Sequence, residues 1–206
     1  MTETEKRTTN IAIRASIEGI VDILGTNGAK ILFKNAGLIH IFENPPGYDW
    51  NPSITITEQA SIYSEVANLL GLNGAISLWR RMGYTVLKYA VEVGHTLDAY
   101  NDLPQDEKFY KGMELFTLGS GKGRVVKNDD GSVDFDCFDC IHCAGYKTKR
   151  PMCSHYEGFI QYISDWAYGK GVYIARETKC KAMGDDTCYF QFKKVDDLTV
   201  GRVIKD

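Results

Sequence analysis

The chain has 206 residues, with 24 lysines and arginines against 27 aspartates and glutamates, and a formal net charge of −3. This length suits one compact domain with a core large enough to need no disulfide bonds. Because the basic residues are scattered and not in excess, the composition argues against binding to nucleic-acid phosphates. The polar start MTETEKRTTN and the absence of a long apolar run favour a cytoplasmic protein without membrane insertion.

Apolar side chains at helical spacing predict two helices at the start of the chain, over residues 10–25 and 27–37, each ended by a glycine. The following stretch NPPGYDWNP, residues 44–52, is predicted as a loop because its prolines and glycine disfavour regular structure.

Thr57 and Glu58 open the next helical pattern, and a longer pattern covers residues 75–97. We expect these two helices to pack as a hairpin. A further helix is predicted after Pro104, ending at the glycine-rich residues 119–123.

Short β-type runs replace the helical patterns from residue 123 onward. Residues 123–138 contain two such runs around Asn-Asp-Asp-Gly, which is a hairpin-type turn. A helix is predicted over 154–169 and a second hairpin over 172–195. We see no internal repeat and no flexible linker. The pattern predicts an α+β fold, with N-terminal helices packed on an antiparallel β-sheet and a C-terminal helix plus β-hairpin that carries a metal site.

All six cysteines lie in the last third of the chain. In a reducing compartment, clustered cysteines indicate metal binding or redox chemistry before they indicate structural disulfides. The six are Cys137, Cys140, Cys143, Cys153, Cys180 and Cys188.

The stretch ETKCKAMGDDTC places Cys180 and Cys188 at equal distances from a turn at Gly184, so the two could be cross-strand neighbours. Glu177 would face the same side only if a β-bulge or a strand end lies between it and Cys180. Cys153, at the start of the preceding helix, is a plausible fourth ligand. Three thiolates and one carboxylate are an acceptable tetrahedral zinc set, which leaves no open position for catalysis.

A second candidate site is the stretch CFDCIHC, where Cys137, Cys140 and Cys143 recur every three residues. This spacing resembles part of a ferredoxin-type run, although the usual fourth cysteine and proline are absent from their expected place. Cys153 could complete four thiolates, but it would then be lost to the zinc set. An iron–sulfur cluster, a second metal ion, a redox-active thiol loop and a buried thiol pair therefore all stay open.

The stretch PMCSHYEGFIQYISDWAYGKGVYIARETKCKAMGDDTCYFQF resembles the C-terminal core of the 4-vinyl reductase domain family, in its cysteines, its Glu-x-x-Cys and its Gly-Asp turn. A weaker resemblance extends through NIAIRASIEGIVDILGTNGAKILFKNAGL. We therefore expect one domain over residues 1–206, with a helical extension over about 1–55 and a ligand-binding core over about 56–196.

The resemblance implies a domain that binds small, often hydrophobic molecules, with a fold shared with Golgi transport-complex subunits. In related phenol-sensing transcription activators a matching residue set binds zinc. The resemblance carries that role to four residues of this chain: Cys153, Glu177, Cys180 and Cys188.

These observations predict a hydrophobic-ligand-binding or sensor domain with a structural zinc site, acting as a homodimer through an unidentified protein partner. The alternative is a redox protein or reductase component with an iron–sulfur cluster on the Cys137, Cys140 and Cys143 loop. If it is an enzyme, the resemblance implies a vinyl reductase-type oxidoreductase, yet no G-x-G-x-x-G motif for a nicotinamide cofactor follows a strand. A third hypothesis is a structural assembly subunit without a ligand.

Overall fold

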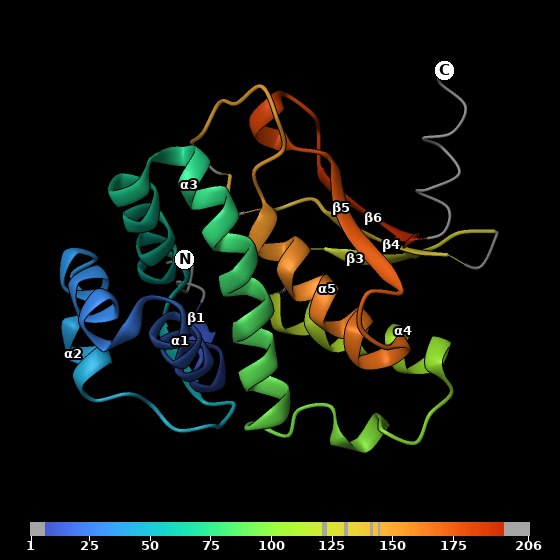
Figure 1. Ribbon diagram of the computed structural model, residues 1–206, viewed down its shortest axis with the longest axis horizontal. Coiled ribbons are helices and arrows are strands. Elements are labelled where there is room, and N and C mark those ends of the chain that lie inside the picture. The colour runs from blue at the N-terminus through green and yellow to red at the C-terminus, as the bar shows by residue number, and fades with distance from the viewer. Residues whose placement is uncertain (1–6, 121–122, 130–131, 141, 144, 196–206) are drawn as a thin grey trace, which may run out of the picture. The chain divides into compact units, whose positions relative to one another are not determined.

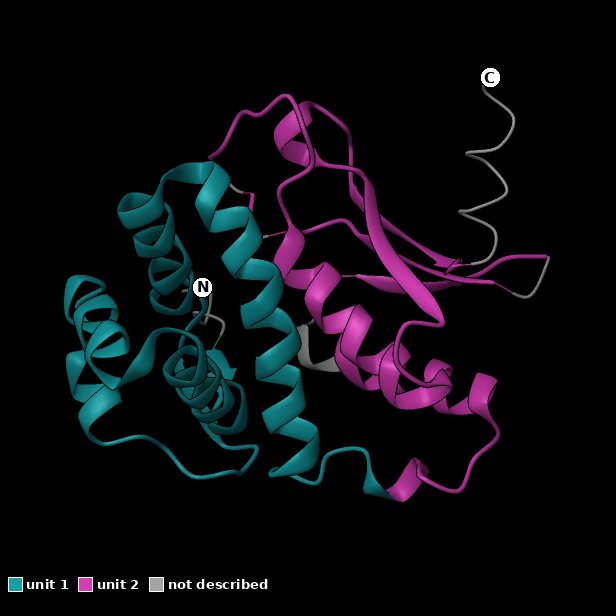
Figure 2. Ribbon diagram, viewed as in Figure 1, with its two compact units in different colours: residues 1–98 teal, residues 99–206 magenta. Residues whose placement is uncertain are grey.

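The computed structural model has helices and antiparallel β-sheets (Figure 1), which confirms the predicted α+β class. Contacts between residues divide the chain into two compact units, Met1–Asp98 and Ala99–Asp206 (Figure 2). The predicted boundary near residue 55 rests on family resemblance and stays a prediction. Within the described part of the chain, no helix has the length and apolar character needed to cross a bilayer.

The structure describes residues 7–120, 123–129, 132–140, 142–143 and 145–195. Part of the predicted glycine-rich helix end, at residues 121–122, and part of the first hairpin turn, at residues 130–131, lie outside the described residues.

Unit 1 is mainly helical, and each of its long helical elements follows a short strand. The two strands pair antiparallel. The second helical element begins with a capping box, in which the Thr55 hydroxyl accepts from the Glu58 N–H at 3.1 Å and the Glu58 carboxylate accepts from the Thr55 N–H at 2.8 Å. The elements are β1 (Arg7–Thr9), α1 (Asn10–Asn35), α2 (Ile39–Glu43), β2 (Pro52–Thr55) and α3 (Ile56–Glu92).

Both long helical elements of unit 1 are interrupted at a glycine. Gly25 in α1 has φ 69° and ψ 166°, and Gly71 in α3 has φ 67° and ψ 162°. Glycine is essentially the only residue that adopts this backbone conformation. The indole of Trp79 donates to the carbonyl of Tyr63 at 3.2 Å across the Gly71 corner. The two halves of α3 therefore fold back on each other (Figure 1), which confirms the predicted hairpin.

The two glycine corners share the sequence Leu-Gly-x-Asn-Gly-Ala, at residues 24–29 and 70–75. In both corners, a Cβ on the second glycine would lie 3.0 Å from the Cβ of the leucine, so the local geometry also repeats. Unit 1 thus contains a repeated strand, helix, corner and helix, and the expectation of no internal repeat is wrong. The repeat is faint in sequence because the first helices of the two copies pack against different neighbours and have diverged, while the corner retains the residues that its backbone requires.

Unit 2 contains a four-stranded antiparallel sheet in the order β3-β4-β6-β5. Helix α5 contacts β5 and α4 contacts β3, and the two helices also contact each other. Both predicted hairpins are present, as β3–β4 and β5–β6. The elements are α4 (Gln105–Ser120), β3 (Arg124–Lys127), β4 (Val133–Cys137), α5 (Ser154–Tyr168), β5 (Tyr173–Lys179) and β6 (Cys188–Lys194).

Aromatic side chains form the core of unit 2, where the helices meet the sheet. Phe109 of α4 stacks on Phe192 of β6 with ring centroids 4.4 Å apart. Tyr156 of α5 meets Phe135 and Phe190 of the central strands edge-on, at 6.0 Å and 5.8 Å. Such aromatic pairs each stabilise a fold by about 0.5–1.5 kcal/mol beyond the burial of their area. This core fixes the N-terminal end of α5 against β4 and β6.

Replacing Gly71 with alanine tests the glycine corner. We expect Gly71→Ala to lower the free energy of unfolding by about 1–3 kcal/mol, because alanine must adopt a backbone conformation that disfavours any Cβ. Urea unfolding followed by circular dichroism measures the change. Ser77→Ala, at an exposed helical position of the same element, is the matched control and should change stability by less than about 0.5 kcal/mol. Equal effects of the two substitutions would contradict a specific role for the corner.

Candidate functional site

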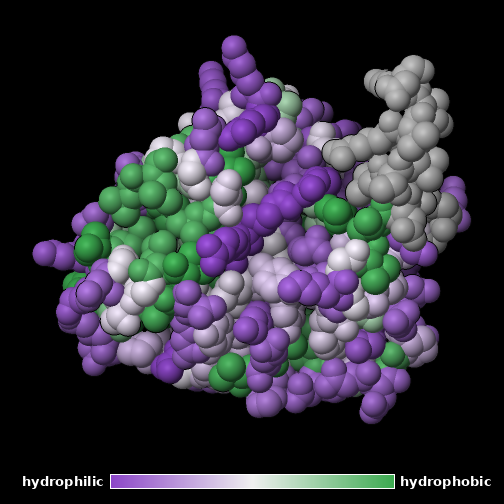
Figure 3. All heavy atoms as spheres, viewed as in Figure 1, coloured by the Kyte–Doolittle hydropathy of each residue, from purple (hydrophilic) through white to green (hydrophobic). Residues whose placement is uncertain are grey.

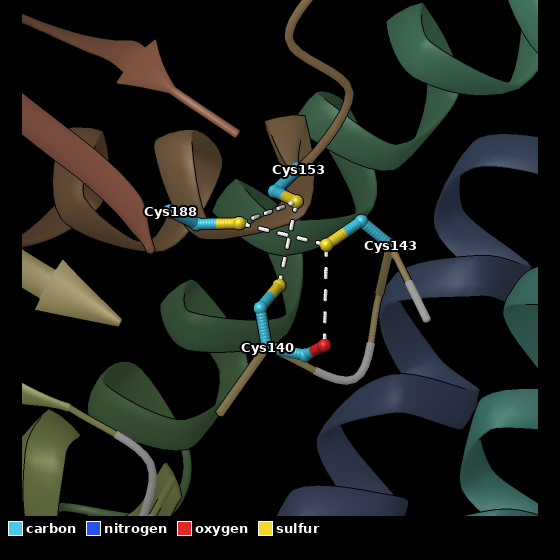
Figure 4. A group of neighbouring side chains, drawn as sticks. All are labelled: Cys140, Cys143, Cys153 and Cys188. Carbon is cyan, nitrogen blue, oxygen red and sulfur yellow. Dashed lines mark hydrogen bonds between the residues drawn. The ribbon is translucent and has the colours of Figure 1, made fainter. Parts of the chain in front are cut away.

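All six cysteines are buried free thiols, and five of them converge at one end of the unit 2 sheet. The Sγ atoms of Cys140 and Cys153 lie 3.3 Å apart, those of Cys143 and Cys188 3.5 Å apart, and those of Cys153 and Cys188 3.6 Å apart (Figure 4). The Sγ of Cys180 lies 3.8 Å from that of Cys153. The cluster is therefore a single group of sulfurs.

Three separate segments of unit 2 supply the cluster. Cys153 is the N-cap residue of α5, and Cys188 is the first residue of β6. Cys180 directly follows β5, and Cys140 and Cys143 lie in the loop after β4. The sulfurs therefore join a helix start, a β-hairpin and a loop that are far apart in the sequence.

The strand register corrects one expectation about the hairpin. Cys180 lies beyond β5 and opens a short 3₁₀ helix, so it is not the cross-strand partner of Cys188. The strand partner of Cys188 is Cys137 of β4. The bulge that joint ligation by Glu177 requires is present, as a register shift between Glu177 and Lys179. This extra residue turns the Glu177 side chain toward Cys153 and Cys180.

Two overlapping sets of four ligand atoms could each hold a metal ion, since the atoms of each set lie within 4.8 Å of one another. The predicted zinc set is one of them. The other joins Cys140 and Cys143 to two residues of the zinc set, and Cys137 belongs to neither. The sets are Cys153, Glu177, Cys180 and Cys188, and Cys140, Cys143, Cys153 and Cys188.

Glu177 is a buried carboxylate, 7% exposed, held by hydrogen bonds from two directions. Its Oε2 accepts from the Cys153 N–H at 2.7 Å, and its own N–H donates to Oε1 of Glu157 at 2.7 Å. Its Oε1 is buried without a hydrogen-bond partner among the residues that the structure describes. A buried carboxylate oxygen without a donor is costly, and a bound cation would satisfy it.

The electrostatics of the cluster reflect the burial of several acidic groups together. Burial, followed by the charge of Cys180, raises the pKa of Glu177 to about 8. Hydrogen bonding within the cluster, foremost with Cys140, holds the pKa of Cys143 well below its usual range. Interactions with the neighbouring cysteines, first of all with Cys140, raise the pKa of Cys153 far above it. Without a metal, the negative charge therefore concentrates on Cys143 while Cys153 keeps its proton. A divalent cation would displace such protons.

The sulfur spacing matches the ligands of a single metal ion. A zinc–sulfur bond of about 2.3 Å gives a tetrahedron with an edge of about 3.8 Å. The observed Sγ–Sγ separations of 3.3, 3.5, 3.6 and 3.8 Å approach that edge. In an iron–sulfur cubane each thiolate binds a different iron atom, which spreads the thiolates further apart. The geometry favours mononuclear coordination, and the iron–sulfur cluster on Cys137, Cys140 and Cys143 stays an untested alternative.

Side chains outside the two sets hold the site together. Asp185 accepts from the Cys180 N–H at 2.8 Å, and the Lys181 N–H approaches the Cys188 Sγ at 3.4 Å. The Lys181 ammonium donates to the Phe138 carbonyl at 3.0 Å, and the ring of His142 packs on Tyr156 at 4.7 Å. Sequence reasoning missed these supports, although the Gly-Asp turn at Asp185 was a visible signal.

Comparison with known proteins places the cysteine cluster in a recognised domain. The model of the 4-vinyl reductase domain matches residues 133–194, which include all six cysteines. An uncharacterized protein of Methanocaldococcus jannaschii is 25% identical over 133 residues, which cover 62% of this chain and 82% of that protein.

Two solved structures share the fold. The phenol-responsive sensory domain of the transcription activator PoxR, solved with phenol, has a TM-score of 0.55 at 18% identity, covering 77% of this chain and 86% of that one. An H-NOX protein from S. oneidensis in the Fe(II)NO ligation state has a TM-score of 0.57 at 14% identity, covering 91% and 99%. The fold is therefore one that sensory, ligand-binding domains use. Together with the family match, it confirms the sequence resemblance: residues 133–194 of this chain are a 4-vinyl reductase domain.

Proposed function

We propose that this protein is a sensor domain for a small hydrophobic molecule, stabilised by a structural zinc ion. The observation that carries the proposal is the buried cysteine and glutamate cluster inside a 4-vinyl reductase domain whose fold matches a phenol-responsive sensory domain. Four ligands from the protein would leave the ion no open position, so its role is structural and not catalytic. A change in ligand occupancy would be passed on by a shift between two packings of the chain, read by a protein partner.

The proposed zinc ligands are Cys153, Glu177, Cys180 and Cys188. An ion among them would join the first turn of α5 to the β5–β6 hairpin and would pair the otherwise unsatisfied Glu177 Oε1. The redox alternative differs in a visible property, because an iron–sulfur cluster absorbs visible light and zinc does not.

The protein is also proposed to be a homodimer, joined through an apolar surface of unit 1. A groove of about 230 Å³ lies at the two corners, and Figure 3 shows apolar residues gathered over unit 1. Ile31, Leu69 and Leu70 at this groove are 55%, 51% and 52% exposed, which is unusual for large apolar side chains. The groove takes matching residues from both repeats, Leu24 with Leu70 and Leu32 with Leu78. A surface with such local two-fold character suits a symmetric contact with a second copy.

Ligand binding is tested on protein purified without oxygen. We expect an apolar molecule to copurify and to appear in an organic extract by mass spectrometry. We also expect phenol, toluene or decanoic acid to raise the midpoint of thermal unfolding, because a ligand that binds only the folded state stabilises it. Glycerol at the same concentration is the polar control. Absence of both a copurifying apolar molecule and any stabilisation by the three probes would contradict the sensor proposal.

The metal site is tested with a matched pair of substitutions at the paired strand positions 137 and 188. Cys188→Ser should remove the bound zinc and lower the free energy of unfolding by about 3 kcal/mol or more, as expected for loss of a structural metal. Cys137→Ser, also buried but outside both ligand sets, should keep the zinc. Elemental mass spectrometry measures zinc per chain, and a visible spectrum checks for iron–sulfur absorption. Loss of metal in Cys137→Ser with retention in Cys188→Ser would instead support the cysteine loop.

The dimer is tested by placing a charge in the unit 1 groove. Leu70→Glu should weaken self-association by at least about tenfold, because a buried, unpaired carboxylate costs more than the ~1.4 kcal/mol that this factor represents. Analytical ultracentrifugation over a range of concentrations gives the dissociation constant. Val93→Glu is the control, since Val93 is an exposed apolar residue of unit 1 that does not line the groove. A monomeric wild-type protein, or equal effects of both substitutions, would contradict this interface.

A further inference from the structure

We infer that the cysteine cluster holds two metal ions bridged by the thiolates of Cys153 and Cys188. One ion would take Glu177 and Cys180 as its terminal ligands, and the other would take Cys140 and Cys143. This inference rests on the proposed zinc site and extends it. It replaces the competition for Cys153 seen in the sequence with a shared ligand.

The two ligand sets have the geometry of two tetrahedra that share one edge. The shared edge is the 3.6 Å separation of the Cys153 and Cys188 sulfurs. From that edge, Cys140 lies 3.3 Å from Cys153, Cys143 lies 3.5 Å from Cys188, and Cys180 lies 3.8 Å from Cys153. All these separations approach the edge of about 3.8 Å expected for tetrahedral zinc with sulfur ligands. Figure 4 shows the four sulfurs of the second set pointing toward one another.

A single tetrahedral ion cannot use all six ligand side chains, since it accepts four. If it occupied only the all-cysteine set, Glu177 would stay buried at 7% exposure with its Oε1 unsatisfied. If it occupied only the set with Glu177, the buried thiols of Cys140 and Cys143 would lie 3.3 Å and 3.5 Å from ligand sulfurs with no cation of their own. Two ions give every one of these groups a cation.

The charge of a two-ion site is also manageable at this position. Two divalent cations oppose five thiolates and one carboxylate, which leaves a modest negative excess. The Lys181 N–H points at the bridging Cys188 sulfur at 3.4 Å, and the other bridging residue, Cys153, caps the N-terminal end of the 15-residue helix α5. Backbone N–H groups and the positive end of a helix both stabilise thiolate charge.

The second ion would attach the loop after β4 to the rest of unit 2. That loop also contacts the hairpin through the Lys181 bond to Phe138 and through the Thr148 N–H, which donates to the Ala182 carbonyl at 2.8 Å. Its all-thiolate ligand set is softer than the one containing Glu177, so the second position suits zinc and, still better, cadmium.

The test is the number of metal ions per chain in a set of variants, on full-length protein stripped of metal under reductant and reconstituted with zinc. Native mass spectrometry counts the ions on each folded chain, and circular dichroism verifies folding. We expect two ions in the wild type and in Cys137→Ser. One ion is expected in Cys180→Ser and one in the double variant Cys140→Ser/Cys143→Ser. None is expected in Cys188→Ser.

Cadmium offers a second readout that does not depend on the stability of a variant. Wild-type protein loaded with cadmium-113 should give two resonances in the range of thiolate-rich sites. The double variant Cys140→Ser/Cys143→Ser should lose one of them and keep the other.

The possible results separate this inference from the proposed zinc site. One ion in the wild type, kept in the Cys140→Ser/Cys143→Ser variant and lost in Cys180→Ser, would overturn the two-ion site and leave the proposed zinc site standing. One ion lost in the double variant but kept in Cys180→Ser would overturn both and move the metal to the all-cysteine set. No bound metal in the wild type would also overturn both.

Discussion

Cys153 is the point on which unit 2 depends, because it contacts every other part of the cysteine cluster. Its sulfur lies within 3.8 Å of three other cysteine sulfurs, from the loop, from the end of β5 and from the start of β6. Its backbone N–H is bound by Glu177. Burying so many acidic groups in one place is unfavourable unless protons or cations compensate them. The cluster therefore couples the folding of three distant segments to the binding of metal.

The aromatic core beside the cluster explains how such a site is positioned. Tyr156, one turn into α5, packs between Phe135 and Phe190 and on the ring of His142. The helix start that presents Cys153 and the loop that presents Cys143 are thus fixed by the same apolar contacts. Metal ligation and hydrophobic packing reinforce each other here, so removing the metal is expected to loosen the loop and hairpin more than the aromatic core.

Unit 1 follows a different principle, the repetition of one helical corner. The Gly25 and Gly71 corners each reverse a helix at a backbone conformation that only glycine tolerates well. Because the second glycine of each corner lies directly against the preceding leucine, the two arms can approach closely. The side chains that remain exposed around these corners are leucines and an isoleucine. Such a surface is better suited to association with another chain than to contact with water.

Local signals in the sequence determined the secondary structure and one of the two ligand sets. Helical spacing, the glycines and the Gly-Asp turn predicted α5, both hairpins and the reversal within α3. The spacing of Glu177 and Cys180 even required the β-bulge that the structure contains. These features depend on residues near one another in the chain, where backbone geometry restricts what is possible.

Only the tertiary structure decided which cysteines meet. In sequence, Cys137, Cys140 and Cys143 form one run, yet β4 pairing places Cys137 opposite Cys188 and outside both ligand sets, while the following loop carries Cys140 and Cys143 to Cys153 and Cys188. The repeat in unit 1 was likewise hidden until the two corners could be compared as backbone conformations. Contacts between distant segments depend on strand register and core packing, which spacing along the chain does not specify.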